Sequence, residues 1–381
     1  MQHNKILVYD ENIETLKSKK ISNDVISKSK QNRRPLGDIC TNLTTNNNDI
    51  LEKKSEKQNQ ENSNEIKLKT SPILEQGLTV QSSNSSTDEC LKKALDLAKR
   101  DYDITLKEKL YGLTEYVDDV YEYLRNLECQ NLIGSKHLNG TEMTERMRSI
   151  LVDWMIDVHS HFRLGQETLE LSVYILDRYT EIKRNLNKRN AQLLGLVCIF
   201  LAAKYEETEP LEVCDIVFVS DSAVLQKDVL RAERSILRSI DYNFSRPLPV
   251  HFVRRYSKIG DVTPIEHSYA MYFCDIALLE YSLVSVRPSM IAAAALFLAL
   301  CVSKDVIDVK IWNDNFKNNT KYELKDFYHI LPRIATTVEH SSKSKLEAVK
   351  KKYATPERYY VSMMPGVQPD LKGTVIKHFC Q

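Results

Sequence analysis

The stretch Met147–Phe162, MRSILVDWMIDVHSHF, decides the fold of this chain together with FLAAKYEE at Phe200–Glu207. In the first stretch, residues spaced i, i+4, i+7 and i+10 lie on one side of an α-helix: Met147, Leu151, Trp154 and Asp157. Apolar residues also occur elsewhere around this helix, at Ile150, Met155, Val158 and Phe162. A helix with several apolar stripes buries one face in its own core and either buries the other or offers it to a partner. Neither stretch resembles a catalytic motif.

Length and charge narrow the classes of protein. The chain has 381 residues, which is enough for two or three domains of ordinary size. Its 53 Lys and Arg nearly balance its 52 Asp and Glu, so no overall positive field predicts a nucleic-acid partner. The longest apolar run, Met290–Val302, is too short to cross a membrane and is typical of a buried core helix. The first residues, MQHNKILVYDEN, lack the apolar region of a signal peptide.

The cysteines favour neither a metal centre nor a redox pair. The eight cysteines are scattered, and no two lie within four residues of each other. A zinc ribbon or a redox motif needs closely spaced cysteine pairs. We therefore expect no metal and no cofactor, and reduced thiols as in a cytosolic or nuclear protein.

Aromatic residues mark the first domain boundary. Residues 1–101 contain one aromatic, Tyr9, whereas all ten Phe and both Trp lie beyond position 150. The polar early segment cannot bury enough apolar surface to offset chain entropy, so we predict a disordered tail over residues 1–105. Helical periodicity begins at about Leu106, and residues 106–145 are predicted to form an N-terminal helix and a linker. Strand-like alternation is nearly absent from the remaining chain, which predicts an all-α fold.

An internal similarity predicts two helical domains in series. Gly195–Ala202 reads GLVCIFLA and Ala292–Ala299 reads AAAALFLA. Small residues let neighbouring helices approach closely, so each copy is expected to be the central helix of its own bundle. The offset is far longer than the period of about 34 to 47 residues typical of helical solenoids. The predicted domains span residues 146–245 and 246–345, followed by a C-terminal extension over 346–381.

Several segments in order resemble a cyclin box. They are MRSILVDW at 147–154, ETLELSVYILDRY at 167–179, QLLGLVCIFLAAKYEE at 192–207 and LRAERSIL at 230–237. The later RPSMIAAAALFLA resembles the second cyclin fold. The resemblance covers roughly Leu113–Tyr360 and is closest to A/B-type cyclins, with the B-type favoured. It implies two consecutive five-helix cyclin folds, preceded by the disordered region.

The resemblance implies a regulatory subunit that is not itself an enzyme. Cyclins bind a cyclin-dependent kinase in a heterodimer and shift it toward its active conformer. The residues that would contact the kinase are Lys204 and Glu233 as polar anchors, Tyr242 beside them, and Tyr116, Val120 and Tyr123 on the preceding helix. Without the resemblance, the charged pair would be ordinary surface, and the stripe on the preceding helix could equally pack within the chain.

A second surface is implied on the helix that contains MRSILVDW. Its residues are Met147, Ile150, Leu151, Trp154, Asp157 and Gln192. In cyclins this patch docks substrates and inhibitors with Arg-x-Leu motifs; the acid pairs with Arg, and burial of Leu contributes roughly 2 kcal/mol. Asp157 is shorter than the Glu common in relatives, and Ala191 replaces a Leu that usually walls the groove, so we expect weaker docking. From the pattern alone, Leu151 and Trp154 are better explained as core residues.

The predicted tail carries a segment that resembles a destruction box. Arg33, Leu36 and Ile39 have its spacing, which implies recognition of the tail by a ubiquitin ligase. Arg-x-x-Leu also occurs at Arg148 and Arg234, but both lie in predicted helices. The basic run KSKQNRR at 28–34 is a weak nuclear-import signal, and we expect residence in both nucleus and cytoplasm.

Three other classes of protein remain to be compared with the cyclin interpretation. A cyclin-fold transcription factor would favour a basic face and a zinc ribbon, which the charge balance and cysteine spacing do not provide. An enzyme would favour a Gly-rich phosphate loop, an HExxH motif or a nucleophile elbow, and the sequence has none of these. A helical scaffold without kinase activation is the remaining alternative.

Overall fold

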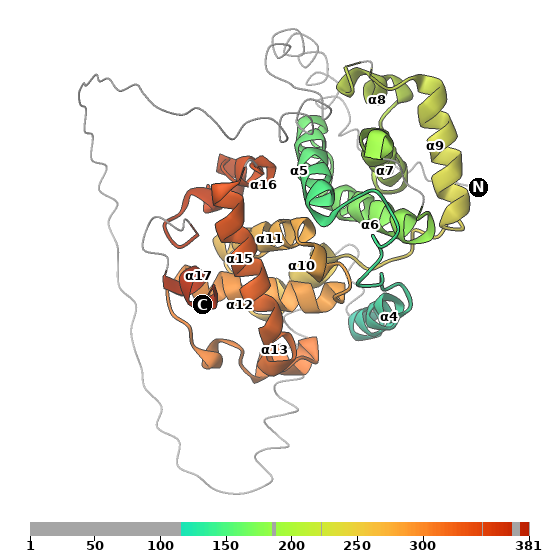
Figure 1. Ribbon diagram of the computed structural model, residues 1–381. Helices are drawn as coiled ribbons and strands as arrows, with labels where there is room; N and C mark the ends of the chain where they lie inside the picture. Colours follow the sequence, from blue (N-terminus) through green and yellow to red (C-terminus); the bar gives the residue numbers. More distant parts are fainter. Residues whose placement is uncertain (1–115, 185–187, 222, 345, 368–373, 381) are drawn as a thin grey trace, which may run out of the picture. The chain divides into compact units, whose positions relative to one another are not determined.

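The computed structural model describes residues 116–184, 188–221, 223–344, 346–367 and 374–380, and these ranges contain helices but no strand (Figure 1). They all belong to one unit of the chain. The all-α prediction is therefore confirmed for the part of the chain that the structure describes. The predicted tail over 1–105 and its destruction box, Arg33, Leu36 and Ile39, lie outside the described residues.

The first set of helices contains the five predicted for a cyclin box. They are α5 (Glu145–Phe162), α6 (Gln166–Ile182), α7 (Ala191–Glu206), α8 (Val213–Val219) and α9 (Gln226–Ser239). Helix α7 contacts each of the other four, and residues 194–203 are all buried. The prediction that GLVCIFLA forms a central helix is confirmed.

Gly195 explains how α5 approaches α7 so closely. A Cβ at this position would lie 3.0 Å from Cδ1 of Leu151 and 3.3 Å from Met155. Glycine inside a helix costs about 0.5–1 kcal/mol relative to alanine. Here the missing side chain leaves the space that the side chains of α5 occupy, and this close contact fixes how deeply α5 lies in the bundle.

Helix α5 buries more than one of its faces. It begins where the Thr144 side chain accepts a hydrogen bond from the Met147 backbone N–H at 3.2 Å, and it ends at Arg163 in the left-handed conformation. Besides α6 and α7, it contacts α11 (Pro264–Leu279) and α16 (Ala348–Lys352). The apolar residues around this helix are thus largely explained by packing within the chain.

The second set of helices follows the same course with one addition. It consists of α10 (Pro249–Ile259), α11, α12 (Pro288–Lys304), α13 (Asp314–Thr320), the one-turn α14 (Leu324–Phe327) and α15 (Leu331–Lys343). Proline at the first position starts α10, α11 and α12, where the missing N–H costs no helical hydrogen bond. Helix α12 contacts α10, α11, α14 and α15, and residues 292–299 are all buried. The second central helix is therefore confirmed as well.

Arg148 forms a buried ion pair within the first set of helices and a further hydrogen bond to the second set. Arg148 of α5 donates from Nε and Nη2 to the two carboxylate oxygens of Asp177 in α6, at 2.6 and 2.7 Å. Its Nη1 donates to the Leu278 carbonyl of α11 at 2.9 Å. Burial raises the pKa of Asp177, but Arg148 and His137 outweigh it and lower that pKa to about 2. In the sequence, Arg148 stood out only as part of an Arg-x-x-Leu match, and this role was not predicted.

The C-terminal extension also connects the two folds. Lys352 of α16 donates to the side-chain oxygens of Gln166 in α6 and Asp275 in α11, both at 2.8 Å. Gln166 itself donates to Asp275 at 2.6 Å. The backbone N–H of Ala348 donates to Asp153 of α5 at 3.0 Å. After this segment comes α17 (Thr374–Phe379), which packs on α15.

Candidate functional site

Helix α4 (Val117–Gln130) presents an apolar stripe to solvent. Tyr116 is 57% exposed, Val120 is 43% exposed and Tyr123 is 62% exposed. These are the residues predicted to contact a kinase from the helix that precedes the first set of helices, α5 to α9. No helix in the described part of the chain buries them, so this stripe is available to a partner there.

The opposite side of α4 is fixed to the second fold. Glu128 is buried and accepts hydrogen bonds from the backbone N–H and the hydroxyl of Ser289, at 2.9 and 2.5 Å. Ser289 lies in the first turn of α12, where a carboxylate is favoured by the helix dipole. Tyr121 donates to the His251 carbonyl of α10 at 3.1 Å. These bonds hold α4 in one orientation, which leaves its apolar stripe outward.

Lys204 and Glu233 lie together at the surface of the first fold. Lys204, in the last turn of α7, has its Nζ 2.6 Å from Oε1 of Glu233 on α9. The same Nζ lies 4.1 Å from the ring centroid of Phe200. The Lys204 side chain is 42% exposed and that of Glu233 is 12% exposed, so the pair is open to solvent mainly on the lysine side. The Lys204 ammonium can therefore also reach polar groups of a partner while it stays close to Glu233.

Tyr242 follows α9 in a conformation that projects it outward. Asp241 and Tyr242 both have left-handed backbones, with φ of 53° and 55°. The Tyr242 N–H closes the end of α9 by donating to the Leu237 carbonyl at 3.0 Å. Its side chain is 63% exposed. A non-glycine residue in this region is strained by about 1–2 kcal/mol, and such strain is often found at binding sites.

The predicted docking patch is only partly exposed. Met147, Ile150, Trp154 and Gln192 are half-buried on α5 and α7, and Asp157 is exposed at the edge. Leu151 is 1% exposed and packs against Gly195. Leu151 therefore lies beneath the half-buried residues of the patch, because the close approach of α7 covers it. Ala191 is buried as well.

A second acid lies near the edge of this patch. Asp153 is one turn before Asp157 on α5 and accepts from the Ala348 N–H. Burial, with a smaller contribution from Asp157, raises the pKa of Asp153 to about 6. Asp153 was not predicted from the sequence, because its burial depends on α16, a helix almost two hundred residues later in the chain.

Neither a metal centre nor a membrane span is found within the described ranges. No group of three His, Cys, Asp or Glu there is placed to hold a metal ion. No helix among the described residues is both long and apolar enough to cross a membrane. The six cysteines of these ranges are free thiols.

Comparison with known proteins identifies two domains. Residues 119–245 match the model of the cyclin N-terminal domain, and residues 247–366 match that of the cyclin C-terminal domain. A solved viral cyclin from herpesvirus saimiri has the same fold, with a TM-score of 0.50 at 21% identity, over 57% of this chain and 96% of that one.

Relatives with more similar sequences are B-type cyclins. The chain is 37% identical over 272 residues to the G2/mitotic-specific cyclin-B of Patella vulgata, and 39% identical over 266 residues to the cyclin-B2 of Anguilla japonica. These alignments cover 71% and 69% of this chain, and 65% of each relative, which is slightly less than two thirds of their length. The two domain matches, the helical fold and these relatives together show that the chain belongs to the cyclin family and is similar to its B-type members.

Proposed function

We propose that this chain is the activating subunit of a cyclin-dependent kinase and drives cell-cycle progression as B-type cyclins do. It would be a regulator and not itself an enzyme. The observation that carries the proposal is the Lys204–Glu233 pair, which lies at the surface of a cyclin fold at a distance of 2.6 Å. The exposed Tyr242 and the apolar stripe on α4, formed by Tyr116, Val120 and Tyr123, support it.

The physical basis of activation is a shift between kinase conformers. A partner that binds one conformer better than another moves the population toward it by the difference in binding free energy. The Lys204–Glu233 pair would give polar groups to backbone atoms of the kinase, which fixes the register of the complex. The exposed aromatic residues would supply buried area at little cost in side-chain entropy.

We further propose that the α5 patch docks Arg-x-Leu segments of substrates and inhibitors. Asp157 is exposed and would pair with the arginine, while Met147, Ile150 and Trp154 would receive the leucine. Since Leu151 is buried, it would form only the floor. The hydrogen bond that Lys351 donates to Glu347, at 3.0 Å, is the main cause that raises the pKa of Lys351; attraction to Asp157 is a smaller cause, so a positive charge already lies near this acid. The burial of Leu151 and the positive charge near Asp157 both favour weak docking of Arg-x-Leu segments.

The sequence supports a further proposal of regulated removal. Arg33, Leu36 and Ile39 have the spacing of a destruction box, and a ubiquitin ligase would recognise them. Residence in both nucleus and cytoplasm is proposed on the basic run at 28–34.

Reconstitution with a purified cyclin-dependent kinase tests the main proposal. Histone phosphorylation is measured with the kinase alone, with the full chain, and with a Lys204→Ala/Glu233→Ala double variant. The control is Lys317→Ala/Asp314→Ala, which removes a lysine–carboxylate pair of similar separation, 2.9 Å, at the surface of the second fold. We expect strong activation by the wild type and by the control, and loss of activation in the first double variant.

Two outcomes would contradict the proposal in different ways. Activation that survives Lys204→Ala/Glu233→Ala would move the interface away from this pair. A folded chain that activates no cell-cycle kinase would favour the scaffold or transcription alternatives, because neither of these functions requires kinase activation.

A further inference from the structure

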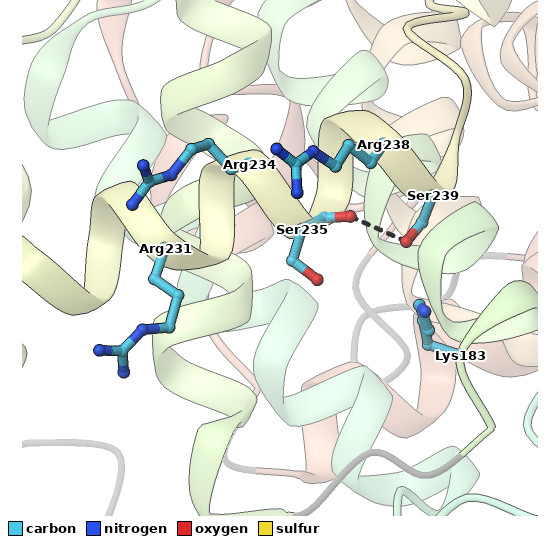
Figure 2. Close-up of a pocket in the computed structure, with 6 residues that line it drawn as sticks. All are labelled: Lys183, Arg231, Arg234, Ser235, Arg238 and Ser239. Carbon is cyan, nitrogen blue, oxygen red and sulfur yellow. Dashed lines mark hydrogen bonds between the residues drawn. The ribbon is translucent and has the colours of Figure 1, made fainter.

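A cluster of cations lines a cavity on α9, away from the groups assigned above. The cavity has a volume of about 400 Å³ and is lined by Lys183, Arg231, Arg234, Ser235, Arg238 and Ser239 (Figure 2). The three arginines are spaced i, i+3 and i+7, so they share one face of α9. Val229 and Ile236, which are buried, mark the opposite face. The cationic face is thus the solvent side of this helix.

The positive charge of this cavity is poorly neutralised. Arg231 pairs with Asp228 at 3.3 Å, but its side chain is 74% exposed. Arg234 donates from Nε to the Leu230 carbonyl of its own helix at 3.1 Å. Among the described residues, no carboxylate is paired with Lys183, Arg234 or Arg238. Three cations that no described carboxylate neutralises therefore gather in a chain whose overall charge is only +1.

The directions of the side chains allow an anion to be approached from two sides. Figure 2 shows that Arg234 and Arg238 leave α9 in one direction, whereas Arg231 and Ser235 leave it on the side where Lys183 lies. At 1.5 Å of rise per residue, Arg231 and Arg238 are about 10 Å apart along the helix. About three residues of an extended peptide span that length.

The chemistry of these groups favours phosphate over carboxylate. A guanidinium presents a planar fork that binds phosphate oxygens in pairs, and charge-assisted bonds of this kind are about twice as strong as neutral ones. A phosphoserine or phosphothreonine carries about 1.5 to 2 negative charges and three acceptor oxygens. The Ser235 hydroxyl, which lies 3.1 Å from the Tyr179 hydroxyl, adds a polar group to the lining of the cavity.

We propose that this cavity docks an extended peptide segment that carries a phosphorylated serine or threonine. The inference deepens the proposed function and rests on it in one respect, since a bound kinase would produce such segments close by. Glu233, assigned above to kinase contact, lies on the same helix α9, but its side chain pairs with Lys204 of α7 and lies away from the cationic face. A substrate phosphorylated once would therefore be held by the same helix that contacts the kinase, which would favour a second modification.

Binding to the full chain alone, without a kinase, tests the inference. The probe is a short fluorescent peptide with one phosphoserine followed by proline and no Arg-x-Leu, so that the α5 patch does not contribute. Anisotropy is measured against the unphosphorylated peptide and against a single-stranded RNA of similar length. The test variant is Lys183→Ala/Arg231→Ala/Arg238→Ala. The matched control, Lys304→Ala/Lys310→Ala/Lys350→Ala, removes three exposed lysines elsewhere.

We expect the phosphopeptide to bind, the unphosphorylated peptide to bind at least about tenfold more weakly, and added salt to weaken binding by screening the charges. The test variant should lose at least about tenfold in affinity, and the control should lose little. Equal binding of the two peptides, or equal loss in both triple variants, would overturn the inference. RNA binding tighter than that of the phosphopeptide, and lost in the test variant, would overturn it in favour of nucleic acid.

A failure of this inference can be told apart from a failure of the proposed function. The test variant should still activate a kinase toward an unphosphorylated histone peptide, because its three positions are outside the surface assigned to the kinase. Normal activation without phosphopeptide binding would reject only the docking cavity. Phosphopeptide binding by a chain that activates no kinase would reject only the activator proposal.

Discussion

Arg148 and Asp177 form a bidentate ion pair that is almost completely buried, and the same guanidinium also donates a hydrogen bond to the Leu278 carbonyl of the second fold. Removing one partner of such a pair leaves an uncompensated charge in the interior. We expect Arg148→Ala to lower the free energy of unfolding by about 3–5 kcal/mol. Urea denaturation followed by circular dichroism measures this change.

Arg178, which pairs with Glu181 on the surface of α6, supplies the control for this experiment. Arg178→Ala should cost less than about 1 kcal/mol, because exposed ion pairs contribute little. Similar losses from both substitutions would show that the burial of Arg148 has no special energetic weight.

Gly195 sets the distance between α5 and α7, so a larger residue there should be costly. Gly195→Val would place carbon atoms within 3.0 Å of Leu151 and force α5 outward. We expect a loss of about 1–3 kcal/mol in the free energy of unfolding, as is usual for overpacked cores. Gly195→Ala adds only the Cβ and should cost less. Thermal unfolding compares the two, and a neutral valine variant would mean that the two helices separate freely.

The buried carboxyl of Glu170 predicts a pH dependence of stability. Burial raises its pKa from an ordinary value of 4.5 to about 8, despite a hydrogen bond from the Val250 N–H at 3.0 Å. Since the folded chain holds this proton more tightly than the unfolded chain, its contribution to stability is complete below about pH 4.5. That contribution is lost as the pH rises toward about 8.

Glu170→Gln should remove this part of the pH dependence. Wild type and variant are compared by denaturant unfolding at several pH values between 5 and about 8, and the variant should lose less stability over this range. Glu122→Gln, at an exposed site on α4, should follow the wild type. Parallel curves for wild type and Glu170→Gln would show that Glu170 is already ionised in the folded chain at the lower pH.

The strained backbone at Tyr242 predicts opposite effects on stability and on activation. Asparagine tolerates the left-handed conformation better than tyrosine. Tyr242→Asn should therefore raise the free energy of unfolding by up to about 1 kcal/mol, while it weakens kinase activation. Tyr359 has the same conformation, with φ of 56°, and is also exposed. Tyr359→Asn should stabilise the chain similarly and leave activation unchanged; a loss of activation in both variants would argue against a specific role for Tyr242.

The central helices were predictable because their signal is local. Ten consecutive residues of α7 and the alanine run of α12 are buried on all sides, and small apolar residues in series indicate this without knowledge of the neighbours. Lys204 and Glu233 are 29 positions apart, and only the resemblance to cyclins suggested that they act together.

Features that depend on tertiary neighbours were not predictable from the pattern. Asp177 is also 29 positions from Arg148, and nothing in the single sequence pairs them. The pattern favoured core positions for both Leu151 and Trp154, but only Leu151 is fully buried, because Gly195 on α7 lets the two helices approach closely there. Asp153 was likewise not predictable, because it is buried by α16, whose Ala348 N–H donates a hydrogen bond to it.

The anchoring of α4 has a consequence for how this chain can be divided. Glu128 and Tyr121 attach this helix to Ser289 and His251, which belong to the second fold, although α4 precedes the first fold in sequence. The two folds are therefore not independent modules. A gene product that stops after the first fold would retain Lys204 and Glu233 and lose the bonds that orient the exposed stripe of α4, so an early stop codon in the second half would damage a surface encoded in the first.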